Sequence, residues 1–100
     1  MNIPWEIEIL LSAVIKDVRR EIGRAVEKHG IDKTPLNPGM SPGDAFLCIA
    51  EETGELAHEL TYDAAGTAQE RVLKAEAEAI QVAAMGIAFV VGSQRRQLLP

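Results

Sequence analysis

The sequence predicts an all-α fold, a helical bundle of three main helices that is completed by oligomerisation. Three observations support this fold class. The chain has 100 residues, which is the size of a single domain covering residues 1–100. Hydrophobic residues make up 47% of the chain but aromatic residues only 4%, and such an aliphatic composition favours helices over sheets. Apolar side chains also recur every three or four positions along most of the chain.

The first helix is expected over residues 4–29. Proline is common in the first turn of a helix because its φ angle is already helical, and Pro4 occupies that place. Charged residues fill the side opposite an apolar stripe. The stripe consists of Ile7, Leu11, Val14, Val18, Ile22 and Val26. Gly30 is expected to end this helix. Residues 30–43 contain three prolines and three glycines, so we expect a crossover or a functional loop without regular structure.

The second helix is expected to run from Ser41, its capping residue, to about residue 62. Pro42 would be its first helical residue, and Asp44 lies three residues after the cap. An apolar stripe centred near Thr53 is formed by Phe46, Ile49, Thr53, Leu56 and Leu60. On a helical wheel, Glu52, Glu55 and Glu59 fall on a flank beside that stripe. Residues 63–66 are expected to form the turn that ends the helix.

The third helix is expected to begin after Thr67 and to continue to about residue 97. Glu70 lies three residues after Thr67 and would complete a capping box with it. Between residues 79 and 91, Gln81 is the only polar side chain. A helix that is apolar all round must be buried on all sides, and two other helices can hardly achieve that. The sequence therefore predicts a homo-oligomer, either a dimer or a tetramer.

Composition also bears on the partners of the protein. The net charge of −5 argues against nucleic-acid binding, which normally requires a basic surface. Cys48 is the only cysteine, which is compatible with the reducing cytoplasm, where we expect the protein to reside. The longest apolar run, residues 82–92, is shorter than the roughly 20 residues that cross a bilayer, so no membrane partner is expected. The acidic N-terminal segment lacks the basic region of a signal peptide.

Acidic and amide side chains form two groups at helical spacing. Glu51, Glu52 and Glu55 lie on the second helix, while Glu78 and Gln81 share one face of the third. Glu78 lies at the start of the apolar stretch, and burying an unpaired carboxylate is costly. A cation would offset that cost, and hard divalent ions take oxygen ligands and also hold substrate phosphates. The sequence therefore predicts a Mg²⁺ site between these helices, with Mn²⁺ as an alternative ion.

Residues 50–57, Ala-Glu-Glu-Thr-Gly-Glu-Leu-Ala, resemble the first motif of the MazG-like, all-α nucleotide pyrophosphohydrolases. That motif is Glu-Glu-x-x-Glu, commonly with Gly before the third Glu and Leu after it. The family's second motif, Glu-x-x-Asp, lies on the next helix, and here 22 residues separate Glu55 from Glu78. The helix ending at residues 28–30 and the loop after it also fit, so the resemblance covers most of the chain. Gln81 departs from the pattern, because the family has Asp there.

The resemblance implies a set of ligands for Mg²⁺. Glu52 and Glu55 would bind the ion from the second helix, and Glu78 would bind it from the third. Gln81 would occupy the fourth position through its carbonyl oxygen, which contributes no charge, so metal affinity should fall. Glu51 would orient a ligand, bind a further ion, or act as the base that orients water.

The resemblance also implies the reaction, which is hydrolysis of a nucleoside triphosphate (an NTP or a dNTP) to the monophosphate and pyrophosphate. Clearance of unwanted nucleotides is one use of such an activity. The metal would lower the pKa of a bound water, polarise the α-phosphorus and offset charge on the leaving pyrophosphate. Lys74 and Arg71 lie one and two turns before Glu78 on roughly the same side, which makes them the nearest candidates for phosphate binding.

Two alternatives remain open on the sequence alone. Glu55 and His58 form the i, i+3 pair found in di-iron carboxylate bundles, although that arrangement leaves Glu51 and Glu52 unexplained. The other alternative is a catalytically weak or inactive helical oligomer that binds nucleotide or a protein partner, because Gln81 replaces an acidic ligand.

Overall fold

The computed structural model describes residues 2–61 and 66–100, and this part of the chain is helical without strands. The elements are α1 (Trp5–His29), the short 3₁₀ helix η1 (Ile31–Lys33), α2 (Pro42–Thr61) and α3 (Ala68–Leu98). The predicted all-α class is therefore confirmed. The 31 residues of α3 make it the longest helix, and it is the element on which the other two pack.

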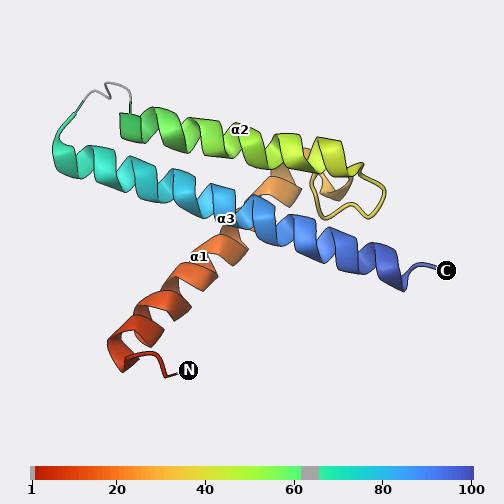
Figure 1. The fold of residues 1–100 in the computed structure, drawn as a ribbon, viewed down its shortest axis with the longest axis horizontal. Coiled ribbons are helices and arrows are strands. Elements are labelled where there is room, and N and C mark those ends of the chain that lie inside the picture. Colours follow the sequence, from red (N-terminus) through yellow and green to blue (C-terminus); the bar gives the residue numbers. More distant parts are fainter. Residues whose placement is uncertain (1, 62–65) are drawn as a thin grey trace.

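The three helices form an open arrangement and not a closed bundle. In Figure 1, α2 and α3 lie side by side in opposite directions, and α1 crosses α3 with its N-terminal half extending away from both. Within the described ranges, α1 and α2 each pack on α3 and not on one another. The radius of gyration is 15.4 Å, whereas a compact domain of this length has about 13 Å. A single chain therefore leaves much of its helical surface uncovered.

Most helix ends follow the sequence. Pro4 directly precedes α1, and its carbonyl oxygen accepts hydrogen bonds from the Ile7 and Glu8 N–H groups at 3.0 and 3.1 Å. Gly30 ends α1 as predicted, with a φ of 83° that favours glycine. At α2, the Ser41 hydroxyl oxygen accepts the Asp44 N–H at 3.1 Å, which confirms the predicted cap.

The cap of α3 differs in one detail from a capping box. The Thr67 hydroxyl oxygen accepts the Glu70 N–H at 3.1 Å, as predicted. The Glu70 carboxylate, however, accepts from the Thr67 hydroxyl at 3.2 Å and not from the Thr67 backbone N–H. The predicted end of the second helix at residue 62, and most of the predicted turn at 63–66, lie outside the described residues.

The connection from α1 to α2 is more ordered than the sequence suggests. The prediction that it lacks regular structure is wrong at η1, where residues 31–33 form one helical turn. Thr34 is buried, and its hydroxyl donates to the Ile31 carbonyl at 2.8 Å. The next residue, Pro35, lies directly against α3 at Gly92, where an added Cβ would overlap the Pro35 carbonyl oxygen. Glycine at position 92 therefore permits the close approach of this loop.

The face of α2 that packs on α3 contains only part of the predicted apolar stripe, namely Ile49 and Leu56. Phe46 and Leu60, which belong to that stripe, are 63% and 65% exposed. The side toward α3 carries Ile49, Leu56 and Ala45, which is buried, together with other half-buried residues at helical spacing. These other residues are Cys48, Glu52 and Glu59. The acidic flank is thus turned toward α3, and part of the apolar stripe is left uncovered.

Much of the apolar surface of α3 is also exposed. Only small residues are buried along it, namely Ala75, Ala84, Ala88 and Gly92. Ile87 and Val90 remain about half exposed, so the predicted burial on all sides is not achieved within one chain. By length and composition α3 could cross a membrane, with 22% of its most apolar 18-residue window buried. Core helices of soluble proteins meet the same criteria, so the expected absence of a membrane partner stays a prediction.

We expect Gly92→Ala to lower the free energy of unfolding by about 1–3 kcal/mol, the usual cost of overpacking a tight contact. The added methyl group must displace the backbone at Pro35, which cannot move as a flexible side chain could. Urea denaturation at fixed protein concentration measures the change. The control is Gly23→Ala in α1, where no atom lies within 4 Å of the new Cβ. That variant should gain up to about 1 kcal/mol from helix propensity, and equal effects of both variants would contradict the close contact.

Candidate metal centre

Packing of α2 against α3 brings three of the predicted ligands together. One carboxylate oxygen from each of Glu52, Glu55 and Glu78 lies within 4.8 Å of the others. Glu52 and Glu55 are three residues apart and share one face of α2, while Glu78 faces them from α3. Glu52 and Glu78 are half-buried, whereas Glu55 is exposed. We refer to these three side chains as the carboxylate cluster.

Gln81 joins the carboxylate cluster through its amide group. With the amide oriented to satisfy its neighbours, the nitrogen donates to Glu52 Oε2 at 2.6 Å and to Glu78 Oε2 at 3.1 Å. Gln81 lies one turn after Glu78 on α3, so both residues face α2. A single amide nitrogen thus bridges carboxylates from two helices. The sequence predicted Gln81 near the ligands, but as an oxygen donor to the metal.

The carboxylate cluster is electrostatically crowded. The pKa of Glu52 is raised to about 7, chiefly by burial and then by the negative charges of Glu55 and Glu78. Burial also raises the pKa of Glu78, helped by a hydrogen bond that the protonated Glu78 carboxyl donates to Glu55 and by the charges of Glu55 and Glu59. A hydrogen bond with Glu52 acts in the opposite direction on Glu78. Both shifts mean that the site disfavours its own negative charge unless a positive charge or a proton is present.

Glu59 belongs to the same region, although the sequence did not predict it as a site residue. It lies one turn after Glu55 on α2, and its charge raises the pKa of Glu78. Its Oε2 atom is buried and has no hydrogen-bond partner among the described residues. An orphaned carboxylate oxygen beside three clustered carboxylates suits a hard divalent cation, so the residues present fit Mg²⁺ or Mn²⁺. The i+4 spacing from Glu55 was the available sequence signal.

Glu51 lies at the margin of this site. Its side chain is exposed and is not part of the carboxylate cluster. Its negative charge nevertheless contributes to the raised pKa of Glu52. The nearby Cys48 thiol has a raised pKa, because of burial and then the charges of Glu51 and Asp44. Cys48 therefore stays protonated and is a poor nucleophile.

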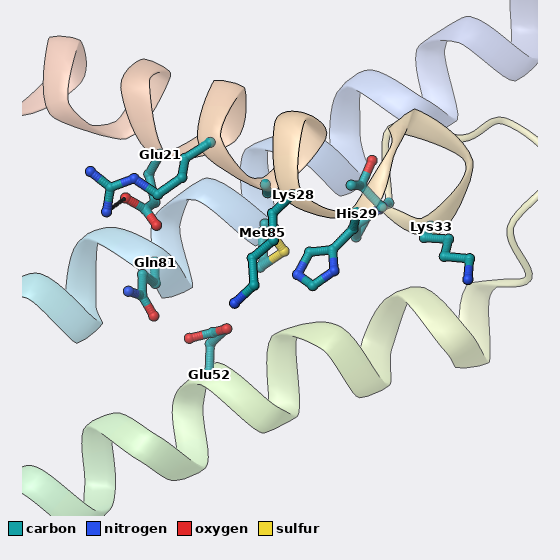
Figure 2. A pocket seen from close by; sticks show the side chains of 11 residues that line it. Glu21, Lys28, His29, Lys33, Glu52, Gln81 and Met85 are labelled. Carbon is teal, nitrogen blue, oxygen red and sulfur yellow. Dashed lines mark ion pairs between the residues drawn. The ribbon is translucent and has the colours of Figure 1, made fainter.

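A cavity of about 310 Å³ adjoins the carboxylate cluster (Figure 2). Glu52 and Gln81 line it on one side, together with Met85 of α3. The opposite side is formed by the end of α1 and the start of the following loop, with Arg24, Lys28, His29 and Lys33 among the lining residues. Figure 2 shows Lys28 and His29 reaching from α1 into the space toward Glu52. The cavity exists because α1 and α2 both pack on α3 while leaving a gap between themselves.

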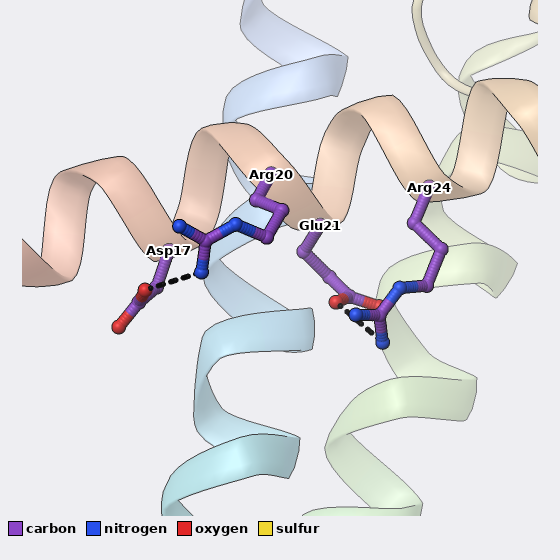
Figure 3. Close-up of polar contacts among 4 residues, drawn as sticks. All are labelled: Asp17, Arg20, Glu21 and Arg24. Carbon is purple, nitrogen blue, oxygen red and sulfur yellow. Dashed lines mark hydrogen bonds and ion pairs between the residues drawn. The ribbon is translucent and has the colours of Figure 1, made fainter.

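The cavity therefore has an acidic side and a basic side. Arg24 is engaged at its rim by Glu21, at 3.4 Å between Nη1 and Oε2, and Figure 3 shows this pair beside Arg20 and Asp17. Lys28 and Lys33, by contrast, have no ion-pair partner among the described residues. Unpaired cations opposite carboxylates can bind an anion while a metal ion shields it from the carboxylates.

The predicted phosphate-binding residues Lys74 and Arg71 do not line this cavity. Arg71 lines a separate hollow with Glu59, Leu60, Ala68 and Val72. Lys74 is exposed and does not line the cavity beside Glu52. Sequence reasoning placed these two correctly on α3, one and two turns before Glu78, but missed Lys28, His29 and Lys33. Their grouping around the end of α1 was a signal, although nothing in the sequence directs that end toward α2.

The di-iron alternative gains no support from the geometry. His58 lies on α2 one turn from Glu55, but the described His, Cys, Asp and Glu residues that come together are Glu52, Glu55 and Glu78. His58 is exposed.

Comparisons of the chain with protein-family models, with curated proteins and with solved structures found no match.

We expect the free energy of unfolding to fall as pH rises from about 4.5 to about 7 on account of Glu52. Its carboxyl has an ordinary pKa of 4.5 but a pKa of about 7 in the folded chain, so the folded state binds the proton more tightly. The resulting stabilisation is fully present below pH 4.5 and is lost as pH rises through 7. The urea concentration at the unfolding midpoint should therefore decline less steeply with rising pH in Glu52→Gln than in the parent.

The matched control for this experiment is Glu27→Gln, which removes an exposed carboxylate from α1. That variant should keep the steep decline of the parent. Identical slopes for the parent and for Glu52→Gln would contradict the raised pKa of Glu52.

Proposed function

We propose that this chain is a Mg²⁺-dependent nucleoside triphosphate pyrophosphohydrolase of the MazG-like kind, acting in the cytoplasm. The observation that carries the proposal is the pairing of the carboxylate cluster with a cavity that is basic on its far side. A triphosphate bound to Mg²⁺ needs both features, because oxygen ligands hold the ion and cations balance the remaining phosphate charge. The resemblance of residues 50–57 to the first MazG-like motif names the reaction, hydrolysis to a monophosphate and pyrophosphate.

Each group of residues has a distinct role in this proposal. Glu52, Glu55 and Glu78 would hold Mg²⁺ or Mn²⁺, and the bound ion would supply an activated water and offset charge on the leaving group. Lys28 and Lys33 would bind phosphate oxygens from the opposite side of the cavity. The exposed carboxylate of Glu51 would orient the attacking water, while Lys74 and Arg71 remain predicted phosphate contacts from outside this cavity.

The proposal includes a dimer or tetramer. The chain exposes 7377 Å² of surface, whereas a compact monomer of 10.8 kDa exposes about 5,500 Å². The excess of roughly 1,800 Å² is about twice what each partner buries in a standard interface. Large apolar side chains contribute to it, including Trp5, which is 74% exposed, and Phe46 on α2. A second copy would cover this surface without requiring any change of fold.

The reaction is tested by assaying pyrophosphate and monophosphate release from a panel of NTPs and dNTPs, with Mg²⁺ or Mn²⁺. We expect metal-dependent pyrophosphate release from at least one nucleotide. Glu52→Gln should lower kcat/KM by at least about 100-fold, because changes one step removed from a metal already cost 10–100-fold. Glu27→Gln should keep the parent's activity. Absence of pyrophosphate from the whole panel, with folded oligomer verified by sedimentation, would contradict the proposed reaction.

One observation favours a second candidate, a helical oligomer that binds nucleotide or a partner without hydrolysis. The amide nitrogen of Gln81 already donates to Glu52 and Glu78, so Gln81 satisfies these carboxylates without adding charge. An Asp at this position would instead add a charged ligand, as in the MazG-like pattern. The two candidates therefore differ in how strongly the site needs a metal ion.

We expect Gln81→Asp to raise the affinity for Mg²⁺ by at least about tenfold, because affinity for hard cations follows the number of charged ligands. Isothermal titration calorimetry measures this change. Gln81→Asn is the matched control, since it has the length of Asp but no charge, and it should not bind Mg²⁺ more tightly than the parent. Hydrolysis that arises in Gln81→Asp but is absent from the parent would identify the parent as a binding module.

A further inference from the structure

The loop between α1 and α2 forms one wall of the cavity. Lys33, Thr34 and Pro35 are consecutive residues, and all three line the cavity opposite Glu52. Thr34 and Pro35 are buried, and Thr34 is held within the loop because its hydroxyl oxygen also accepts the Leu36 N–H at 3.3 Å. The position of Lys33 relative to the carboxylate cluster therefore depends on where this loop lies.

The last turns of α3 hold the loop from its other side. Arg96 donates from Nε to the Pro38 carbonyl at 2.7 Å and from Nη2 to the Met40 carbonyl at 2.8 Å. Arg95 donates from Nη1 to the Leu36 carbonyl at 2.9 Å. One turn earlier, Gly92 lets the backbone of Pro35 approach α3 directly. Charged donors on backbone carbonyls are strong hydrogen bonds, and the planar guanidinium of Arg96 contacts two carbonyls at once.

These contacts are separate from the proposed metal ligands. Neither Arg95 nor Arg96 lines the cavity beside Glu52, and both lie more than three turns after Gln81 on α3. Glu52 and Glu55 are on α2 and Glu78 is on the first half of α3, so none of the cluster is carried by the loop. Loss of the arginine contacts would therefore displace Lys33 while leaving the carboxylate cluster in place.

We propose that Arg95 and Arg96 are positioning residues for phosphate binding: they fasten the loop to α3 and so fix Lys33 across the cavity from Glu52. This inference rests on the proposed function, in which the cavity receives a triphosphate. It assigns a role in ligand affinity to residues that do not touch the ligand. Loss of these arginine contacts should raise KM and leave kcat unchanged, because the loop carries a phosphate contact whereas helices hold the carboxylate cluster.

The test uses the whole chain of 100 residues and inorganic tripolyphosphate with Mg²⁺ as the probe, with binding measured by isothermal titration calorimetry. Arg96→Met should weaken binding at least tenfold. Arg96→Lys keeps the charge but cannot donate from two fixed nitrogens, so its affinity should fall between that of the parent and that of Arg96→Met. Gln97→Met, at the neighbouring exposed position, should bind as the parent does. Arg95→Met removes a single hydrogen bond and serves as the milder variant if Arg96→Met does not fold.

Two further readouts separate positioning from a general loss of structure. Hydrogen exchange should become faster at residues 33–40 in Arg96→Met and stay unchanged at residues 51–59 of α2. With the best nucleotide from the activity panel, KM should rise while kcat is retained. Parent-like affinity in Arg96→Met, or a fall in kcat that matches the rise in KM, would overturn the inference alone. Failure of the parent to bind tripolyphosphate would overturn the proposed function, and the inference with it.

Discussion

The packing of α2 on α3 is the interaction on which the rest of the structure depends. It turns three carboxylates of α2, Glu52, Glu55 and Glu59, toward Glu78 of α3, with an amide from Gln81 between two of them. Apolar side chains would make a more stable contact at this place, because clustered carboxylates repel and lose hydration on burial. The same burial and repulsion raise the pKa values of Glu52 and Glu78. A bound cation would offset the cost of this burial and repulsion, as the proposed function requires.

The packing of both α1 and α2 on α3 also creates the cavity. Since α1 and α2 both pack on α3 without packing on each other, the space between them is open to a ligand. The end of α1 and the loop after it place Lys28 and Lys33 on the side opposite Glu52 (Figure 2). Opposite charges on facing walls suit a ligand that is itself anionic and carries a divalent ion. Arginine side chains of α3 hold the same loop in place. The loop that carries Lys33 and the helix that carries Glu52 are therefore both positioned by contacts with α3.

The open shape of the chain explains why its core is made of small residues. Ala84 and Ala88 are the most deeply buried side chains, and no large side chain is fully buried in the described ranges. Small residues along α3 allow α1 and α2 to approach it closely, but they bury little apolar area. Many of the larger aliphatic and aromatic side chains of all three helices are exposed. In the proposed oligomer, further copies would remove that surface from water and add to the stability of the fold.

The sequence by itself determined the helices, most of their ends and the spacing of the acidic motifs. These are local properties, because helical periodicity and capping depend on residues a few positions apart. It also brought Glu52, Glu55, Glu78 and Gln81 into one candidate site. The tertiary structure decided which face of α2 packs inward, and it chose the acidic flank over the stripe of Phe46 and Leu60. Periodicity identifies an apolar face but does not specify which neighbour covers it.

The cationic side of the site was decided only by the tertiary structure. Lys74 and Arg71 were predicted because they share a helix with Glu78, which is a relation that sequence spacing can reveal. Lys28 and Lys33 lie near Glu52 only because α1 crosses α3 at a particular point and the following loop is fastened by Arg95 and Arg96. The fastening residues are more than 50 positions from the loop that they hold. A crossing point is set by the packing of whole helices, and no local pattern of residues encodes it.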